Sequence, residues 1–221
     1  MKNLWKTWDK RPVKIFITIC LLFGIGGLPC MAENRNEDLD SLTFVEMVNS
    51  VDVSDFSKVI QDWQELEAKR NLLKKYNDKA GCSVLTYRNK EVLLITIPAE
   101  DLFDPNETLL KAKADEFLNP IKRYLNKPDF FRVLLAMHTD NTGSSQYRDD
   151  ITDERVESIF EWFYDKGCDT SFLFPYAMGD DVPLFPDNDS MENRAKNRRL
   201  EIYLMPGTKM LEQAKKGIIE F

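Results

Sequence analysis

One acidic and one basic residue, fifteen positions apart, are the side chains of this sequence best placed to bind a small charged ligand. Asp140 lies three residues after the end of the apolar run at 130–137, and Arg155 lies near the predicted start of a helix. In α/β proteins, small ligands tend to bind where a buried strand ends and leads into a helix N-terminus. A carboxylate and a guanidinium at such a place suit a ligand that carries both an ammonium and a carboxylate group.

The same residues also have a purely structural interpretation. Asp140 and Asn141 can build a turn before Gly143, because Asp and Asn side chains hydrogen-bond to their own backbone in turns. Arg155 can pair with the neighbouring Glu154 or Asp153 on the helix surface. The local pattern alone leaves both interpretations open.

The sequence gives less support for a catalytic or metal-binding site than for a ligand-binding site. His138 is the only histidine, and no serine or cysteine lies in a recognisable nucleophile turn. One His and the isolated Cys82 and Cys168 do not make a zinc site. We therefore expect no enzyme, no metal and no cofactor, and we keep hydrolysis at His138 and Asp140 as a remote alternative. The two cysteines either pair as a disulfide or remain free thiols.

Residues 1–32 are typical of a cleaved secretory signal peptide. Basic residues precede the apolar run at 15–28, which is shorter than the roughly 20 residues that a bilayer-spanning helix needs. Cleavage after Ala32 is favoured over lipidation of Cys30, because Pro29 fits a lipoprotein site poorly. We expect a periplasmic protein, and association with the outer membrane is left open.

The charge balance excludes several classes of partner. The chain has 30 basic and 37 acidic residues, for a net charge of −7; residues 1–32 hold five of the basic residues and one acidic residue, so cleavage leaves 25 and 36, a net charge of −11. Such an acidic surface repels phosphate backbones and anionic lipids. We therefore expect no nucleic-acid binding and no peripheral membrane adhesion as main activities.

Hydrophobic periodicity predicts an α/β sandwich, a mixed sheet with helices packed on one face. The predicted elements are an acidic tether at 33–53, an amphipathic helix at 54–80 capped by Ser54, strands at 82–88 and 91–99, a helix at 106–125 interrupted by Pro120, a strand at 130–137, a helix at 152–166 capped by Thr152, strands at 171–179 and 198–206, and a tail at 207–221. The helix at 54–80 has nearly heptad spacing, but Arg70 interrupts its apolar stripe. Packing against the following domain is therefore favoured over a coiled coil.

Two separated motifs resemble the OmpA/MotB C-terminal peptidoglycan-binding family. The stretch HTDNTGSSQYRDDITDERV at 138–156 is similar to the family's H-T-D-x-x-G loop and the arginine-containing helix that follows, and NDSMENRAKNRRLEIYL at 188–204 is similar to its N-R-R-V-E-I close. The similarity spans residues 93–204 and implies an OmpA-like domain over 81–206. It also implies that Asp140 and Arg155 hold the zwitterionic end of diaminopimelate in the peptidoglycan stem peptide.

The resemblance implies further ligand-binding residues. Asn106, Thr142 and Arg198 match family positions that line or approach the ligand. Arg148 stands where the family usually has an asparagine that contacts the ligand, so its cation either adds a carboxylate contact or repels the ammonium. Other positions depart from the family pattern at Met137, Val156 and residues 192–193.

Two functions from different classes follow. The first is a non-catalytic protein that binds peptidoglycan and tethers the envelope to the cell wall. The second is an OmpA-fold scaffold that binds an envelope protein through residues 54–78 and the acidic loop at 180–193, with weak or no affinity for peptidoglycan. Homo-oligomerisation is compatible with either function.

Overall fold

The computed structural model describes residues 37–51 and 55–221. The predicted signal peptide, its cleavage site, Cys30 and the Ser54 cap lie outside the described residues. Among the helices of the described segments, none combines the length and apolarity that crossing a bilayer requires.

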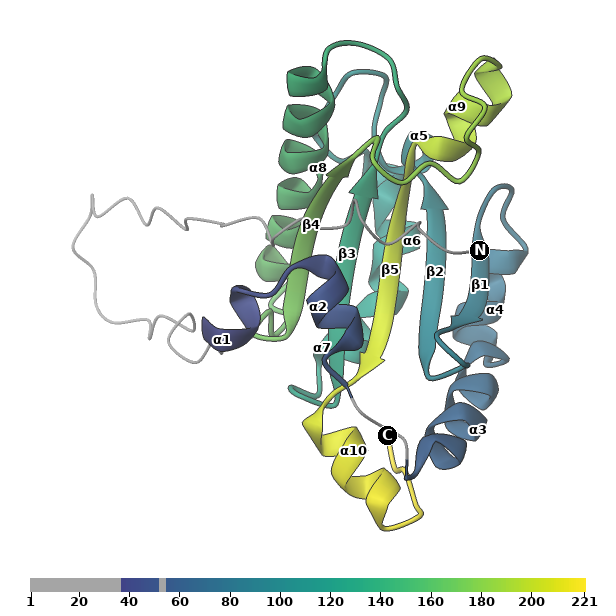
Figure 1. Ribbon diagram of the computed structural model, residues 1–221, viewed down its shortest axis with the longest axis vertical. Coiled ribbons are helices and arrows are strands. Elements are labelled where there is room, and N and C mark those ends of the chain that lie inside the picture. Colours follow the sequence, from purple (N-terminus) through teal and green to yellow (C-terminus); the bar gives the residue numbers. More distant parts are fainter. Residues whose placement is uncertain (1–36, 52–54) are drawn as a thin grey trace, which may run out of the picture.

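A five-stranded mixed sheet forms the centre of the fold (Figure 1). Its strands are β1 (Ser83–Tyr87), β2 (Val92–Pro98), β3 (Phe131–His138), β4 (Leu173–Gly179) and β5 (Arg199–Pro206). They lie in the order β1-β2-β5-β3-β4; β3 and β4 are parallel, and the other neighbours are antiparallel. Each strand begins and ends within two residues of the range that the sequence predicts, and the predicted α/β class is confirmed.

The helices that follow β2 and β3 cover one face of this sheet. They are α5 (Ala99–Leu102), the 3-10 turn η3 (Ala112–Ala114), α6 (Asp115–Leu118), the 3-10 turn η4 (Asn119–Ile121), α7 (Lys122–Leu125) and α8 (Ser145–Asp165). The predicted helix at 106–125 is thus a series of short turns from residue 112 onward. Pro120 lies in η4, where its missing N–H group breaks the regular α-helical hydrogen bonding.

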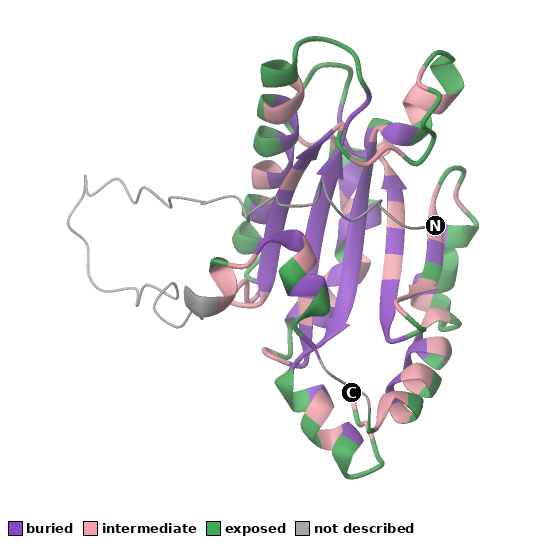
Figure 2. Cartoon of the chain, viewed as in Figure 1, coloured by how far each residue is buried: buried purple, intermediate pink, exposed green. Residues whose placement is uncertain are grey.

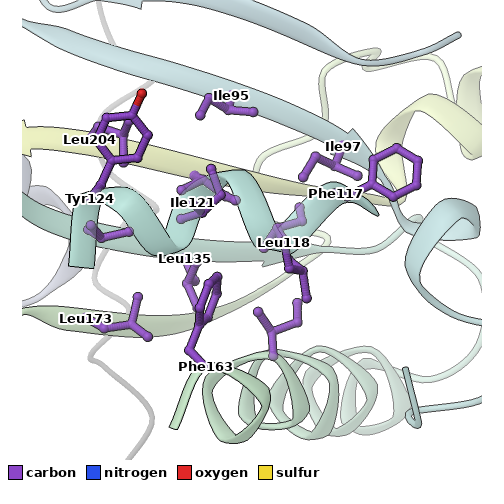
Figure 3. Close-up of a cluster of buried hydrophobic side chains, with 14 of the residues drawn as sticks. Ile95, Ile97, Phe117, Leu118, Ile121, Tyr124, Leu135, Phe163, Leu173 and Leu204 are labelled. Carbon is purple, nitrogen blue, oxygen red and sulfur yellow. The ribbon is translucent and has the colours of Figure 1, made fainter. Parts of the chain in front are cut away.

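The main hydrophobic core lies between the sheet and these helices. Ile95 and Leu135 of the sheet face Ile121 of η4 and Phe163 of α8 (Figure 3). Strands β3, β4 and β5 are buried along most of their length, whereas the edge strand β1 is mostly not buried and the outer surfaces of the helices are exposed (Figure 2). Since successive strand residues point to opposite faces, Leu134 belongs to a second cluster on the other side of the sheet.

That second face is covered in part by α2 (Phe44–Asn49), within the segment predicted to be a tether. The Phe44 ring packs edge-on against Tyr176 at 5.4 Å and Tyr203 at 5.2 Å between ring centres. Thr43 and Glu46 form a capping box that fixes the start of the helix. The prediction of a tether is therefore wrong for this part of 33–53; a helix of six residues is too short to show a periodic pattern.

Arg88 forms hydrogen bonds at the C-terminal end of α2. It lies in the turn between β1 and β2, and its guanidinium donates hydrogen bonds to the backbone carbonyls of Val48 and Val51. Val48 lies in the last turn of α2 and Val51 just beyond its end, where backbone carbonyls have no hydrogen-bond partner within the helix. The β1–β2 hairpin thus holds α2 against the sheet.

The predicted helix at 54–80 is two helices, α3 (Ser57–Ala68) and α4 (Asn71–Asn77), with a break at residues 69–70. Its buried side includes polar groups that the apolar stripe does not reveal. Gln64 donates to the backbone oxygens of Glu91 (3.0 Å) and Leu204 (3.3 Å), and the Tyr124 hydroxyl donates to Glu67 (2.9 Å). These bonds join the helix to the domain, as the packing interpretation predicts.

The remaining helices are α1 (Glu37–Asp40), α9 (Met191–Asn197) and α10 (Thr208–Lys215). α9 and α10 lie at opposite ends of the sheet, and α1 lies to the side of it, next to α2 (Figure 1). The predicted tail at 207–221 therefore contains a helix, and Met210 and Ala214 of α10 are buried. Phe221 packs its ring against Trp63 at 5.8 Å between centres, so this segment is part of the core rather than a tail.

We predict that Phe44→Ala lowers the free energy of unfolding by about 3 kcal/mol, because it empties a buried ring site between α2 and the sheet. Asn49→Ala, at an exposed position of the same helix, is the matched control and changes stability by less than about 0.5 kcal/mol. Urea unfolding followed by circular dichroism measures both. Equal stability of the two variants would show that α2 contributes no packing.

Candidate ligand-binding site

A cavity of about 1010 Å³ opens at one end of the sheet. At this end β2 and β3 finish, β5 begins, and α5 and the first turns of α8 lie close by (Figure 1). Five of the six residues predicted to bind a ligand line this cavity, namely Asn106, Asp140, Thr142, Arg155 and Arg198. The fold therefore brings together residues that are up to 92 positions apart in the sequence.

Asp140 occupies the buried end of the cavity, with 3% of its surface exposed. One carboxylate oxygen accepts a hydrogen bond from the backbone N–H of Thr142 (2.8 Å), and the other accepts one from the Arg198 guanidinium. Burial opposes ionisation of this group, but the bonds from Thr142 and Arg198 outweigh it and lower its pKa. Asp140 is therefore a carboxylate at neutral pH, as an ammonium ligand requires.

The loop after Asp140 leads directly into α8. Gly143 has a φ of +87°, and a Cβ atom there would come within 2.7 Å of the Tyr147 ring, so both the backbone conformation and the available space favour glycine. The Ser144 hydroxyl accepts a bond from the backbone N–H of Tyr147 (3.2 Å) and caps the helix. The Tyr147 hydroxyl donates to Asn106 (3.0 Å), which ties α8 to the loop after α5 at the rim of the cavity.

The start of α8 corrects the predicted environment of Arg155. The helix begins at Ser145 rather than near Thr152, so Arg155 lies in its middle and the free N–H groups of the first turn do not act on it. The first two turns of α8 are largely exposed and polar, and for this reason they show no apolar periodicity. Tyr147, Ile151 and Arg155 recur every four residues and share the helix face that lines the cavity.

Arg155 is a buried cation without a carboxylate partner. It is 4% exposed; its Nε donates to the backbone oxygen of Glu107 (2.9 Å), and one terminal nitrogen donates to that of Asp104 (3.3 Å). Its guanidinium carbon also lies 4.9 Å from the centre of the Phe103 ring. Burial lowers its pKa from the usual value of an arginine. Within the described segments Arg155 forms no ion pair, so its charge is available to a ligand carboxylate.

Arg148 does not line the cavity, contrary to the prediction for this residue. Its Nε lies 2.7 Å from an Asp180 carboxylate oxygen, and a terminal nitrogen donates to the backbone oxygen of Gly143 (2.6 Å). Asp180 neutralises the Arg148 cation, which accordingly neither attracts nor repels a ligand strongly. Its structural role is to brace the Asp140 loop against the chain that follows β4.

His138 belongs to a separate buried network. It is 1% exposed, and its Nε2 lies 3.3 Å from Glu201, which also accepts bonds from Arg199 (2.8 Å) and the Tyr203 hydroxyl (2.6 Å). Burial, and then the charge of Arg199, lower the pKa of His138. His138 does not line the cavity with Asp140, so the two residues offer no shared hydrolytic site.

Several features around the cavity were not evident from the sequence. Glu100 lines it without an ion pair in the described part of the chain, and Lys111 bonds to Asp104 (2.9 Å) and to the backbone oxygen of Glu100 (3.0 Å). The four-residue spacing of Tyr147, Ile151 and Arg155 could have indicated the lining face of α8, but no local signal marks Glu100 or Lys111. Elsewhere, the two cysteines of the described residues are free thiols, so the alternative of a disulfide is not realised.

Comparison with known proteins identifies the domain that carries this cavity. The OmpA family model matches residues 102–198. Residues 102–198 are therefore similar to an OmpA-family domain. The match confirms the resemblance that the two sequence motifs indicate, and it contains all six predicted ligand residues.

Relatives and solved structures agree with this assignment. Outer-membrane lipoprotein YfiB of Pseudomonas aeruginosa is 31% identical over 46% of this chain and 60% of its own length. A MotB-like protein of Desulfovibrio vulgaris shares the fold with a TM-score of 0.56, 23% identity, and coverage of 67% of this chain and 97% of its own. The cell wall anchor of the T6SS from Pseudomonas aeruginosa also shares the fold, with a TM-score of 0.53, 22% identity, and coverage of 61% of this chain and 94% of its own. The chain covers between 13% and 60% of the length of the curated relatives that it matches.

We predict that His138 in the OmpA-like domain makes folding stability fall on mild acidification. Its pKa is lower in the folded state than the value near 6.5 of an unfolded histidine, so below that pH the unfolded chain binds a proton first. Stability then decreases with falling pH by at most about 1.4 kcal/mol per pH unit. In His138→Gln this contribution is absent, and urea unfolding between pH 7.5 and 5 compares the two proteins. Parallel stability curves would contradict a lowered pKa of His138.

Proposed function

We propose that this protein is a non-catalytic cell-wall binding protein that holds the diaminopimelate-containing stem peptide of peptidoglycan and tethers the envelope to the wall. The observation that carries the proposal is the shared cavity of Asp140 and Arg155. The two side chains bond to different partners rather than to each other, so their charges do not neutralise one another.

The charges fit the free end of diaminopimelate, where one carbon carries an ammonium and a carboxylate. Asp140 accepts the ammonium, and Arg155 donates to the carboxylate with the guanidinium N–H groups that Glu107 and Asp104 leave free. The cavity volume of about 1010 Å³ exceeds that of an amino-acid headgroup, and Asn106 and Thr142 at its rim offer further polar contacts to the adjoining peptide.

The names of related proteins support the location and the partner. One solved structure of this fold is described as a cell wall anchor, and a relative is an outer-membrane lipoprotein. By analogy we propose a periplasmic location with contact to the outer membrane, an anchoring role, and no catalytic step.

A single site of this kind binds weakly, but the wall offers many copies of its ligand. Exposed ion pairs contribute about 0.2 to 1 kcal/mol each, and charge-assisted bonds in a partly buried site somewhat more. Peptidoglycan presents the same stem peptide at high local density, so rebinding makes weak contacts persistent. Reversible retention, rather than permanent attachment, is the expected behaviour.

A scaffold function is the second candidate, and one surface favours it. The acidic segment between β4 and β5 exposes the apolar side chains of Leu184, Phe185 and Met191. Exposed apolar groups on a surface segment are typical of sites that bind other proteins. This surface is separate from the residues that line the cavity, so variants can test the two functions independently.

We predict that Asp140→Asn and Arg155→Gln each reduce co-sedimentation of the purified protein with peptidoglycan sacculi at least about tenfold, because each removes one charge of the pair. Asp187→Asn and Lys74→Gln, at exposed positions outside the cavity lining, are the charge-matched controls and retain binding. Thermal unfolding confirms that all four variants are folded. Unchanged sedimentation of the two cavity variants, or no sedimentation of the wild type, would refute the proposal and favour the scaffold function.

Arg148→Asn restores the residue that the family usually has and tests whether this position contacts the ligand. We predict a change in sacculus binding of less than about twofold and a loss of stability of no more than about 1 kcal/mol, the range for a partly exposed ion pair. Asp180→Asn removes the same ion pair from its other side and should have the same effect on stability. A large gain in binding by Arg148→Asn alone would place residue 148 in contact with the ligand.

A further inference from the structure

The carboxylate proposed to hold the ligand's ammonium already has a cation bound to it. Both oxygens of Asp140 are occupied, one by the backbone N–H of Thr142 and the other by the Arg198 guanidinium. The Asp140 side chain is only 4% exposed, and a carboxylate buried to this degree needs a compensating charge. An ammonium group can therefore reach Asp140 fully only if Arg198 gives up its place.

The contacts of Arg198 permit this exchange, because they fix its backbone but not its side chain. Its backbone is fixed on both sides, because its N–H donates to the Arg194 carbonyl (3.1 Å) and its own carbonyl accepts from the N–H of Ala99 (2.9 Å). Its side chain, by contrast, is 38% exposed and has no hydrogen bond other than that to Asp140 within the described residues. The guanidinium can thus turn to solvent without breaking any other contact.

We propose that Arg198 is an exchangeable counter-ion, which neutralises Asp140 in the empty cavity and is displaced by the ammonium group of the ligand. This inference rests on the proposed function. Among the described residues Arg155 has no acid partner to release, so a carboxylate binds it without competition from another carboxylate. The competition therefore acts on the ammonium half of the ligand alone, and it makes Arg198 a specificity-determining residue.

The exchange has a direct consequence for ligand selection. A dicarboxylate that lacks an amine has no group to replace Arg198, and it interacts with Arg155 only. A zwitterion gains the Asp140 contact but must first displace a guanidinium. Removal of the Arg198 charge should therefore help the zwitterion and leave the dicarboxylate without a gain.

The test measures binding of meso-diaminopimelate and pimelate to the full chain by isothermal titration calorimetry. In Arg198→Gln we expect the affinity for meso-diaminopimelate to rise about two- to fivefold, the range that corresponds to one partly exposed ion pair. Affinity for pimelate, which has the same carbon chain without amines, should not rise. Arg198→Lys keeps a competing cation and should behave like the wild type.

A second measurement tests the ion pair without any ligand. The bond from Arg198 contributes to the lowered pKa of Asp140, so Arg198→Gln should raise that pKa toward the ordinary value. The ¹³C chemical shift of the Asp140 carboxyl group, followed against pH, measures the change. Asp181→Asn, an acid outside the cavity lining, is a control that should leave the titration of Asp140 unchanged.

The outcomes separate the exchange from the proposed function. If the wild type binds meso-diaminopimelate and Arg198→Gln binds it equally or more weakly, Arg198 is not a competitor and the inference is overturned. An unchanged titration of Asp140 in Arg198→Gln overturns it as well. If neither protein binds meso-diaminopimelate or sacculi while the titration still detects the Asp140–Arg198 pair, the proposed function itself has failed.

Discussion

The register between β3 and β5 is the constraint on which the site depends. These antiparallel strands pair His138 with Arg199, so the next residues outward on the two chains, which include Asp140 and Arg198, meet beyond the end of the ladder. A shift of one residue would turn every side chain of the strand to the opposite face. Such a shift would turn Leu134 and Ala136 toward the main core, between the sheet and α6–α8. The carboxylate of Asp140 would then lose its counter-ion, Arg198. The burial of both faces of β3 thus fixes the geometry of the charges at its end.

Strand positions could be predicted from the sequence because burial leaves a local signal. β3 and β4 are almost continuously buried, and their apolar runs mark them within two residues. The start of α8 and the existence of α2 could not be predicted in the same way. The first turns of α8 face solvent, and α2 is held by Phe44 against strands and by Arg88 from a distant hairpin, which are contacts that no window of sequence contains.

Residues of the candidate site could be predicted where a family motif lies next to the end of a predicted strand. Asp140, Thr142 and Arg155 were found in this way, and the structure places them in one cavity. Arg148 lies outside the cavity lining because it pairs with Asp180, which lies 32 residues further along the chain. The bond between Arg198 and Asp140 spans 58 residues and follows only from the pairing of β3 with β5. Long-range ion pairs therefore decide which charges remain free for a ligand, and sequence patterns do not reveal them.

The last strand in the chain lies in the middle of the sheet. β5 inserts between β2 and β3, and until it does so the two halves of the sheet share no ladder of hydrogen bonds. Arg198, which lines the cavity and pairs with Asp140, precedes this strand directly and takes its place with it. During synthesis, which proceeds from the N-terminus, a nascent chain that ends before residue 206 therefore cannot assemble the cavity. Ligand recognition should be gained late and all at once, so that incompletely made chains do not compete with finished molecules for the same ligand.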